Sequence, residues 1–243
     1  MRLPAFVRTV ACTATFLVLL HAAPVQATHL MGAELSYSWL GGNDYVLRLA
    51  VWRDCQGIGV GSTFLVEYTS SCGAGTATLV QTDTAEMTSG CNGLLTTCQG
   101  GGFPGADLIY YRDTITLSAC ADWTFSWALC CRNSTLLNVL DPDLQDMLIT
   151  ASLDNLNQPG NSSPIFQELT GPFVCANTPV CIANTGYDPD GDSLVYSHDR
   201  AFGSTWRAAG LPAWVQQHRP VPIHHWSCAW TPPLVTTVQP RAR

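Results

Sequence analysis

The sequence predicts an all-β protein built from Ig-like β-sandwich modules that are stapled by disulfides. Three observations favour this fold class. Apolar and polar residues alternate with a period of two through most of the first half of the chain. Glycine-rich turns separate these runs, and no helical periodicity persists for three turns. Ten of the eleven cysteines lie beyond residue 54, at a density typical of disulfide-bonded proteins.

The chain begins with the features of a secretion signal. Two arginines give a positive start, and the apolar run Val10–Leu20 follows. Val25 and Ala27 occupy the small-residue positions that precede a cleavage site, so we predict a signal peptide over residues 1–27 and a mature start at Thr28. No stretch reaches the roughly 18 apolar residues of a membrane span. We therefore expect a protein that is secreted or held on the outer cell surface, without a transmembrane segment.

The first strands are predicted as a hairpin. Leu35, Tyr37 and Trp39 alternate with serines, and the alternation resumes from Tyr45 to Val51 after a Gly-Gly-Asn-Asp cluster. Two alternating runs around such a cluster are typical of a β-hairpin. A single helical turn is expected near residues 142–146. The same alternation predicts further strands at residues 63–68, 76–81, 113–117, 122–130 and 147–153.

A polar segment at residues 157–164, which carries two prolines and a glycine, predicts a domain boundary. We assign residues 28–157 to a disulfide-rich β-sandwich domain and residues 161–197 to the start of a second, incomplete β module. After Ser197 the last 46 residues hold five Arg and one Asp, and the strand alternation fades. Two interpretations of residues 198–243 stay open: an irregular basic tail, or the product of a frame shift in the gene.

The charge of the chain limits its partners. Between Thr28 and Ser197 there are four Arg and no Lys against seventeen Asp and Glu, a net charge of −13. A segment this acidic is a poor partner for nucleic acid or for an acidic membrane surface. Divalent cations and neutral or basic ligands suit it better. The partner that we expect is an extracellular protein or a glycan.

The cysteines are the strongest candidates for structural chemistry. No pair has the two-residue spacing of a zinc ribbon, and only one histidine of the mature chain precedes residue 198, so disulfides are favoured over metal binding or thiol catalysis. Cys130 and Cys131 would point to opposite faces of a strand, and we expect them to bond to different partners. The disulfide candidates are Cys55, Cys72, Cys91, Cys98, Cys120, Cys130, Cys131, Cys175 and Cys181.

Three carboxylates are grouped at Asp188, Asp190 and Asp192, separated by Pro189 and Gly191. Carboxylates on alternate residues around a tight turn can converge on a hard cation, and they predict a structural calcium ion. The alternative is a plain solvated turn, because the same residue types favour turns without any ligand. Since nothing nearby in the sequence supplies a base or a nucleophile, we assign no catalytic residue.

Four segments carry a family resemblance. They are the mature start from His29 to Tyr37, Arg53-Asp54-Cys55, the stretch from Asp113 to Cys130-Cys131-Arg132-Asn133, and the stretch from Asn161 to Tyr196. In their order and spacing they resemble the N-terminal region of secreted Bacteroidota surface proteins, the PKD-domain or gliding-motility-associated adhesin-like proteins exported by the type IX system. The resemblance implies Ig-like modules, an extracellular location and an adhesive or structural role. The Asp188 turn also resembles cadherin-like repeats that bind calcium, which makes the second module cadherin-like.

These observations predict a secreted or cell-surface protein with a non-enzymatic adhesive or structural role. The alternative is a secreted carbohydrate-active or other hydrolytic enzyme, or a carbohydrate-binding module, because exposed Trp39, Trp52 and Trp123 could stack on sugars. A pair of carboxylates in a cleft with perturbed pKa values would distinguish an enzyme from a binding module.

Overall fold

The computed structural model describes residues 30–87, 95–133, 141–166, 180–182, 186–195, 198–199, 227–229, 237–238 and 241–242. The predicted all-β fold is confirmed, because the described chain consists mainly of strands that pair antiparallel. No described helix is long and apolar enough to cross a membrane. The predicted signal peptide, residues 1–27, lies outside the described residues.

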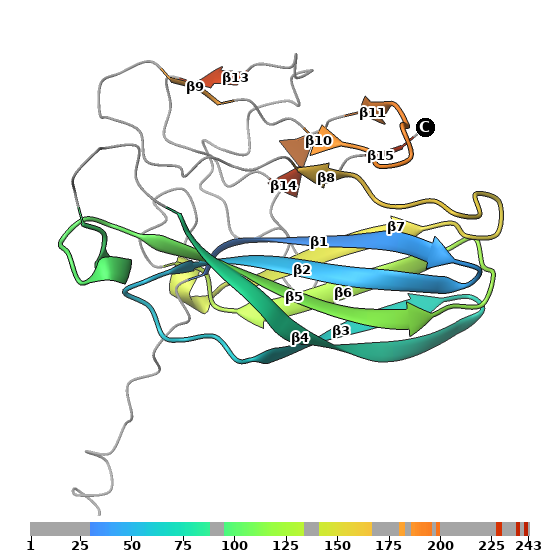
Figure 1. Cartoon of the computed structure of the whole chain (residues 1–243), viewed down its shortest axis with the longest axis horizontal. Coiled ribbons are helices and arrows are strands. Elements are labelled where there is room, and N and C mark those ends of the chain that lie inside the picture. Colours follow the sequence, from blue (N-terminus) through green and yellow to red (C-terminus); the bar gives the residue numbers. More distant parts are fainter. Residues whose placement is uncertain are drawn as a thin grey trace, which may run out of the picture.

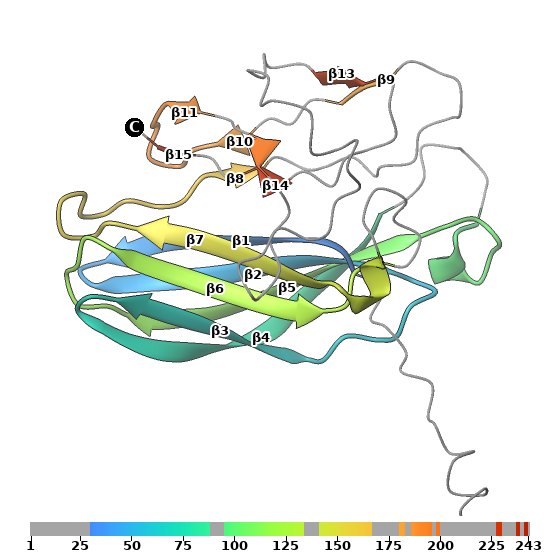
Figure 2. The same ribbon diagram turned by 180° about the vertical axis from the view of Figure 1, so that it is seen from behind.

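Seven strands form one hydrogen-bonded sheet in the order β1-β2-β5-β4-β3-β6-β7. They are β1 (Leu30–Gly41), β2 (Asp44–Asp54), β3 (Thr63–Ser70), β4 (Gly73–Met87), β5 (Ala106–Thr116), β6 (Trp123–Cys130) and β7 (Asp146–Leu153). The sheet folds into two layers, with β1, β2 and β5 in one layer and β3, β6 and β7 in the other (Figure 1 and Figure 2). Two 3₁₀ turns, η1 (Thr97–Gln99) and η2 (Pro142–Leu144), lie in the connections.

Strand β4 belongs to both layers. Its first half, from Gly73 to Val80, pairs with β3, and its second half, from Val80 to Met87, pairs with β5. The register of the second ladder shifts between Gln81 and Asp83, and an irregularity of this kind bends a strand and increases its twist. The long strand therefore passes from one layer to the other, and the two-layer fold follows from this passage.

Alternate residues of β2 form the centre of the core. The side chains of Leu47, Leu49 and Val51 are fully buried, as the alternation of the predicted hairpin requires. The facing layer contributes Phe125, whose ring centroid lies 5.5 Å from that of Tyr37. Burying each such aliphatic or aromatic side chain stabilises the fold by about 1.5–3 kcal/mol relative to leaving it exposed.

Strands β4 and β5 extend well beyond the runs that the sequence predicts. Strand β4 continues past residue 81 to Met87, and β5 begins at Ala106 rather than at residue 113. The added halves pair with each other, and most of this part of β4 is exposed to solvent. The alternation that marks a core strand is therefore weak there. The helical turn expected near residues 142–146 is present as η2.

The remaining described strands are short and form four two-stranded sheets, β8–β10, β9–β13, β11–β15 and β12–β14. They are β8 (Ile165–Phe166), β9 (Val180–Ile182), β10 (Gly186–Tyr187), β11 (Leu194–Val195), β12 (His198–Asp199), β13 (Ser227–Ala229), β14 (Thr237–Val238) and β15 (Arg241–Ala242). Most of residues 198–243 lies outside the described residues, so the prediction of an irregular basic tail stays a prediction.

The segment after β7 returns along the edge of β1. The Ser163 N–H donates to the Tyr37 carbonyl at 2.9 Å, and the Tyr37 N–H donates to Ser163 Oγ at 2.8 Å. The Phe166 N–H then donates to the Glu34 carboxylate at 3.1 Å. These bonds satisfy backbone groups that an edge strand otherwise leaves unpaired. The segment predicted as a domain boundary is thus attached to the sandwich that precedes it.

The placement of the core predicts that two leucines contribute very differently to the free energy of unfolding. Leu49 is fully buried, whereas Leu65 of β3 is 63% exposed. Replacing Leu49 with Ala should lower the free energy of unfolding by about 2–5 kcal/mol, because a cavity adds to the lost burial. Leu65→Ala, the matched control, should change it by about 0.5 kcal/mol or less. Similar losses for both variants in urea unfolding would contradict this core.

Candidate functional site

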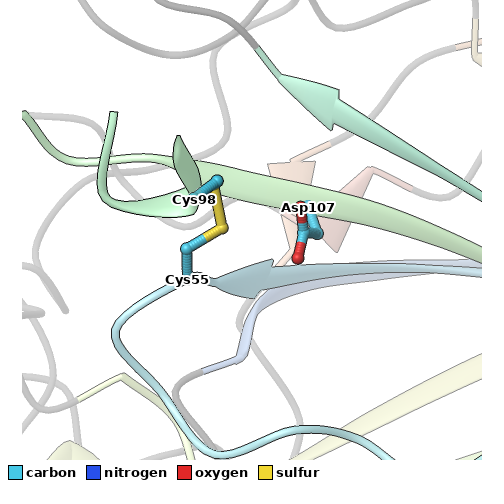
Figure 3. Close-up of side chains that lie close together, drawn as sticks. All are labelled: Cys55, Cys98 and Asp107. Carbon is cyan, nitrogen blue, oxygen red and sulfur yellow. A yellow bond between two sulfur atoms is a disulfide. The ribbon is translucent and has the colours of Figure 1, made fainter. Parts of the chain in front are cut away.

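One disulfide joins the end of β2 to the connection before β5. Cys55 directly follows β2, Cys98 lies in η1, and their Cα atoms are 5.0 Å apart. Figure 3 shows Asp107 of β5 beside this bond, and potential ligand atoms of the three side chains lie within 4.8 Å of one another. The sulfur atoms are bonded to each other, however, and Asp107 forms an ion pair with Arg53. The group is therefore a cross-link beside a salt bridge, and it offers no thiolate for a metal ion.

A second disulfide joins the turn between β3 and β4 to the segment before β6. Cys72 and Cys120 are bonded across 48 residues of sequence, with their Cα atoms 6.0 Å apart. Asp122 lies beside the bond and accepts hydrogen bonds from the Ser71 N–H at 3.1 Å and from the Ser71 hydroxyl at 3.0 Å. The closed loop contains β4 and β5, so this bond constrains the strand that connects the two layers.

Cys130 and Cys131 are bonded to each other, and the expectation that they bond to different partners is wrong. That expectation placed both residues in one strand. Strand β6 ends at Cys130, as the predicted range 122–130 has it, so the alternation does not extend to Cys131, and the two Cα atoms lie 3.0 Å apart. Cys91 and Cys175 lie outside the described residues, and only the backbone of Cys181 is described, so their pairing stays a prediction.

The acidic turn is organised around Asp188, which is 7% exposed. Its Oδ1 accepts the backbone N–H of Asp190 at 2.8 Å and that of Asp192 at 3.4 Å. Its Oδ2 is buried and has no hydrogen-bond partner among the described residues. Asp190 and Asp192 are exposed, and the three carboxylates do not gather their oxygens within 4.8 Å of one another. The convergence that the sequence predicts is therefore absent from this structure, and the calcium ion stays a prediction.

A cavity of about 310 Å³ lies beside the acidic turn. Asp190 and Asp192 line it, and so does the loop from Gln158 to Asn161. The Asn161 side-chain amide donates to the Tyr37 hydroxyl at 3.4 Å, which holds this loop near the edge of β1. Burial raises the pKa of the Tyr37 hydroxyl, and the negative charge of nearby Asp190 raises it further. The cavity thus lies between the loop Gln158–Asn161 and the acidic turn, which are distant in sequence. The carboxylates of Asp190 and Asp192 give it a negative potential.

The three tryptophans considered as sugar platforms differ in exposure. Trp123 is 3% exposed, so the expectation that it can stack on a sugar is wrong. It shares the core-facing side of β6 with Phe125. Trp52 is half-buried on β2, whereas Trp39 is 44% exposed and its indole N–H donates to the Gly42 carbonyl at 3.0 Å. Trp39 is therefore the most exposed of the three, although its six-membered ring lies close to Gly160.

The structure also brings together two arginines that sequence reasoning missed. Arg48 of β2 and Arg112 of β5 are register partners, and both side chains are exposed on the outer side of their layer. Neither forms an ion pair with a described residue, although Arg48 donates to Ser38 Oγ at 3.2 Å. Each arginine occupies an outward position in an alternating strand, and this pattern in the sequence indicated that each side chain is exposed. The pairing of β2 with β5, which a single sequence does not reveal, makes them neighbours.

Comparison with known proteins finds no matching family model, no matching curated protein and no matching solved structure. The resemblance to Bacteroidota surface proteins therefore stays a prediction. A coarser conclusion comes from the disulfides, of which the described residues contain three. Bonds of this kind persist in oxidising compartments and are typical of a protein outside the cytoplasm.

Removing the Cys72–Cys120 bond should destabilise the fold. The free energy of unfolding of the double variant Cys72→Ser, Cys120→Ser should be about 4 kcal/mol lower than that of the wild type. The bond closes a loop of 48 residues, and without it the unfolded chain gains conformational entropy. The matched control is the double variant Cys130→Ser, Cys131→Ser, whose bond spans adjacent residues and closes almost no loop. Guanidinium unfolding under non-reducing conditions, which keep the remaining disulfides intact, compares the two variants with the wild type. A larger loss in the control would contradict the role given to Cys72–Cys120.

The contact between β1 and the segment after β7 should respond to pH. Burial raises the pKa of Glu34 above its ordinary value of 4.5, and the hydrogen bond from the Phe166 N–H opposes this shift in part. Because the folded pKa is the higher one, the wild type loses stability relative to a neutral variant as the pH rises above about 4.5. Glu34→Gln should therefore be the more stable protein at neutral pH, and the gain should disappear near pH 3. Thermal unfolding across this range tests the prediction, and a gain independent of pH would contradict it.

Proposed function

We propose that this protein is a secreted or cell-surface, non-enzymatic binding protein with an adhesive or structural role. The observation that carries the proposal is the exposed pair of Arg48 and Arg112 on β2 and β5. Like charges directly opposite each other on a sheet are destabilising. An anionic group that lies between the two guanidinium groups would convert this repulsion into attraction. The pair is therefore better suited to binding a partner than to holding the sheet together.

The charge distribution of the sandwich favours a partner that presents carboxylates at this face. Arg53 is paired with Asp107 and Arg132 is 4% exposed, which leaves Arg48 and Arg112 as the exposed arginines of the described sandwich. A guanidinium group can bind a carboxylate through two parallel hydrogen bonds. Repulsion from the acidic remainder of the domain is screened beyond about 8 Å at physiological ionic strength. An acidic partner can then dock locally on the arginine pair.

Neighbouring side chains would extend the contact. Tyr110 is 37% exposed on β5, and Val80 is 52% exposed on β4, where it is the register partner of Arg112. Tyrosine and arginine are among the side chains that contribute most to protein interfaces. The layer that carries them faces the viewer in Figure 1. A rigid sheet face of this composition supports binding through a preformed surface.

The disulfides and the all-β fold support an extracellular setting for this role. The resemblance of residues 28–197 to Bacteroidota adhesin-like proteins also supports this role. We therefore include in the proposal that the modules are Ig-like and cadherin-like, that the architecture is of the PKD type, and that the protein takes part in gliding motility. The burial of Trp123 weakens the alternative of a carbohydrate-active enzyme with an aromatic platform on β6.

Binding to carboxylated surfaces should depend on the arginine pair. Polygalacturonate and polyglutamate, each immobilised, present carboxylates on a glycan and on a peptide and so distinguish the two kinds of partner. The double variant Arg48→Gln, Arg112→Gln should bind about tenfold or more weakly than the wild type to whichever probe the wild type prefers, and added salt should weaken the wild type. The variant should also unfold at an equal or higher temperature, because the like-charge contact is gone.

The control for this experiment is Leu65→Gln, an exposed change on β3 in the other layer. It should leave binding unchanged. Equal binding by the wild type and the double arginine variant would contradict the proposal, and so would the absence of binding to both probes.

A further inference from the structure

The outer side of β2 and β5 carries more than the arginine pair. The outward positions that follow Arg48 on β2 are Ala50 and Trp52, and their register partners on β5 are Tyr110 and Leu108. Outward positions of one strand are about 7 Å apart, so the surface from Arg48 to Trp52 is about 14 Å long. This surface, the outer strip, has two cations at one end and mainly apolar side chains along the rest. The layer that carries it faces the viewer in Figure 1.

Ala50 lies in the middle of the outer strip and has larger side chains as neighbours. Its own side chain is a single methyl group, whereas Tyr110 beside it is a large ring that is 37% exposed. Trp52 is half-buried, and its ring lies next to Gly32 of β1, where an added methyl group would be 3.7 Å from Cε3. Because glycine has no side chain, Gly32 does not cover the indole ring. The strip therefore offers two aromatic rings next to one small residue.

A sugar ring suits the outer strip because it has an apolar face and a polar rim. The C–H groups of the apolar face can pack over Ala50 and against the rings of Tyr110 and Trp52. The hydroxyl groups of the rim require hydrogen-bond donors and acceptors around the packed ring. The arginine pair supplies donors. Asp83 supplies an acceptor, since it is exposed on β4 and is the register partner of Tyr110.

An extended acidic peptide suits this surface less well than a glycan. Strand β2 pairs with β1 and β5, and β5 pairs with β2 and β4, so the main-chain groups of the outer strip are used within the sheet. A peptide that adds to a sheet requires an edge strand with free main-chain groups. The Asp83 carboxylate also repels a chain that carries a carboxylate on every residue. A glycan avoids both problems, because it binds through side chains and separates its carboxylates by neutral hydroxyl groups.

We propose that the outer strip binds a glycan that contains uronic acid units. The carboxylate of one unit lies between Arg48 and Arg112, and a sugar ring packs over Ala50 against Tyr110 and Trp52. This inference rests on the proposed function, because it uses the same arginine pair, and it names the chemical class of the partner. The arginines select the negative charge, and the aromatic rings select the sugar. Loss of the rings therefore has a different effect from loss of the arginines.

The test measures the binding of the full secreted chain to polygalacturonate and to polyglutamate of similar length. The wild type should bind polygalacturonate about tenfold or more tightly than polyglutamate, since only the sugar gains the aromatic contacts. Equal binding to the two probes, or tighter binding to polyglutamate, would overturn this inference but leave the proposed function standing if the arginine pair is still required. The absence of binding to both probes would overturn the two proposals together.

Variants of Tyr110 and Ala50 locate the sugar. Tyr110→Ala should weaken binding to polygalacturonate about tenfold and leave binding to polyglutamate unchanged, whereas Tyr110→Phe keeps the ring and should retain most of the affinity. Ala50→Leu fills the space over which the sugar packs, and it should also weaken binding to polygalacturonate alone. The matched control is Tyr187→Ala, which removes a tyrosine of β10 that is 50% exposed, and it should bind as the wild type does. Full affinity of both Tyr110→Ala and Ala50→Leu for polygalacturonate would overturn the assignment.

Discussion

Strand β4 is the constraint on which the rest of the structure depends. It pairs with β3 up to Val80 and with β5 from Val80 onward, so one continuous sheet has to fold over itself. This passage encloses Leu49 and Phe125 in one buried cluster. It also turns the opposite sides of β2 and β5 to solvent, where Arg48 and Arg112 become neighbours. The core and the candidate binding surface are thus two sides of the same strands.

The cross-links hold this strand near both of its ends. Cys72 directly precedes β4 and is bonded to Cys120, while the last residue of β4, Met87, pairs with Ala106 close to the Cys55–Cys98 bond. With the sheet fixed in this way, its edge strand β1 offers a stable surface to which the segment after β7 attaches. The hydrogen bonds between β1 and the segment after β7 bring the acidic turn against the sandwich, and the buried Asp188 lies at that contact.

The sequence predicted the parts of the fold that alternation specifies. The hairpin around the Gly-Gly-Asn-Asp cluster and the strand from Trp123 to Cys130 are confirmed, because one side of each strand is continuously apolar. The second half of β4 was missed, because an exposed strand needs no apolar side. The sequence could not predict strand order, and for that reason it missed the arginine pair. The expectation for Cys131 was wrong because it carried the alternation one residue beyond the predicted end of the strand at Cys130, whereas Cys130 and Cys131 are bonded to each other.

The disulfide connectivity tests the account most directly, because the bonds record which ends of the folded sheet meet. Non-reducing digestion of the secreted protein, followed by mass spectrometry, should recover Cys55 linked to Cys98 and Cys72 linked to Cys120. A single peptide should contain Cys130 and Cys131 in oxidised form. Recovery of Cys72 and Cys120 as free thiols, or linked to other cysteines, would contradict the folded sheet and the surfaces inferred from it.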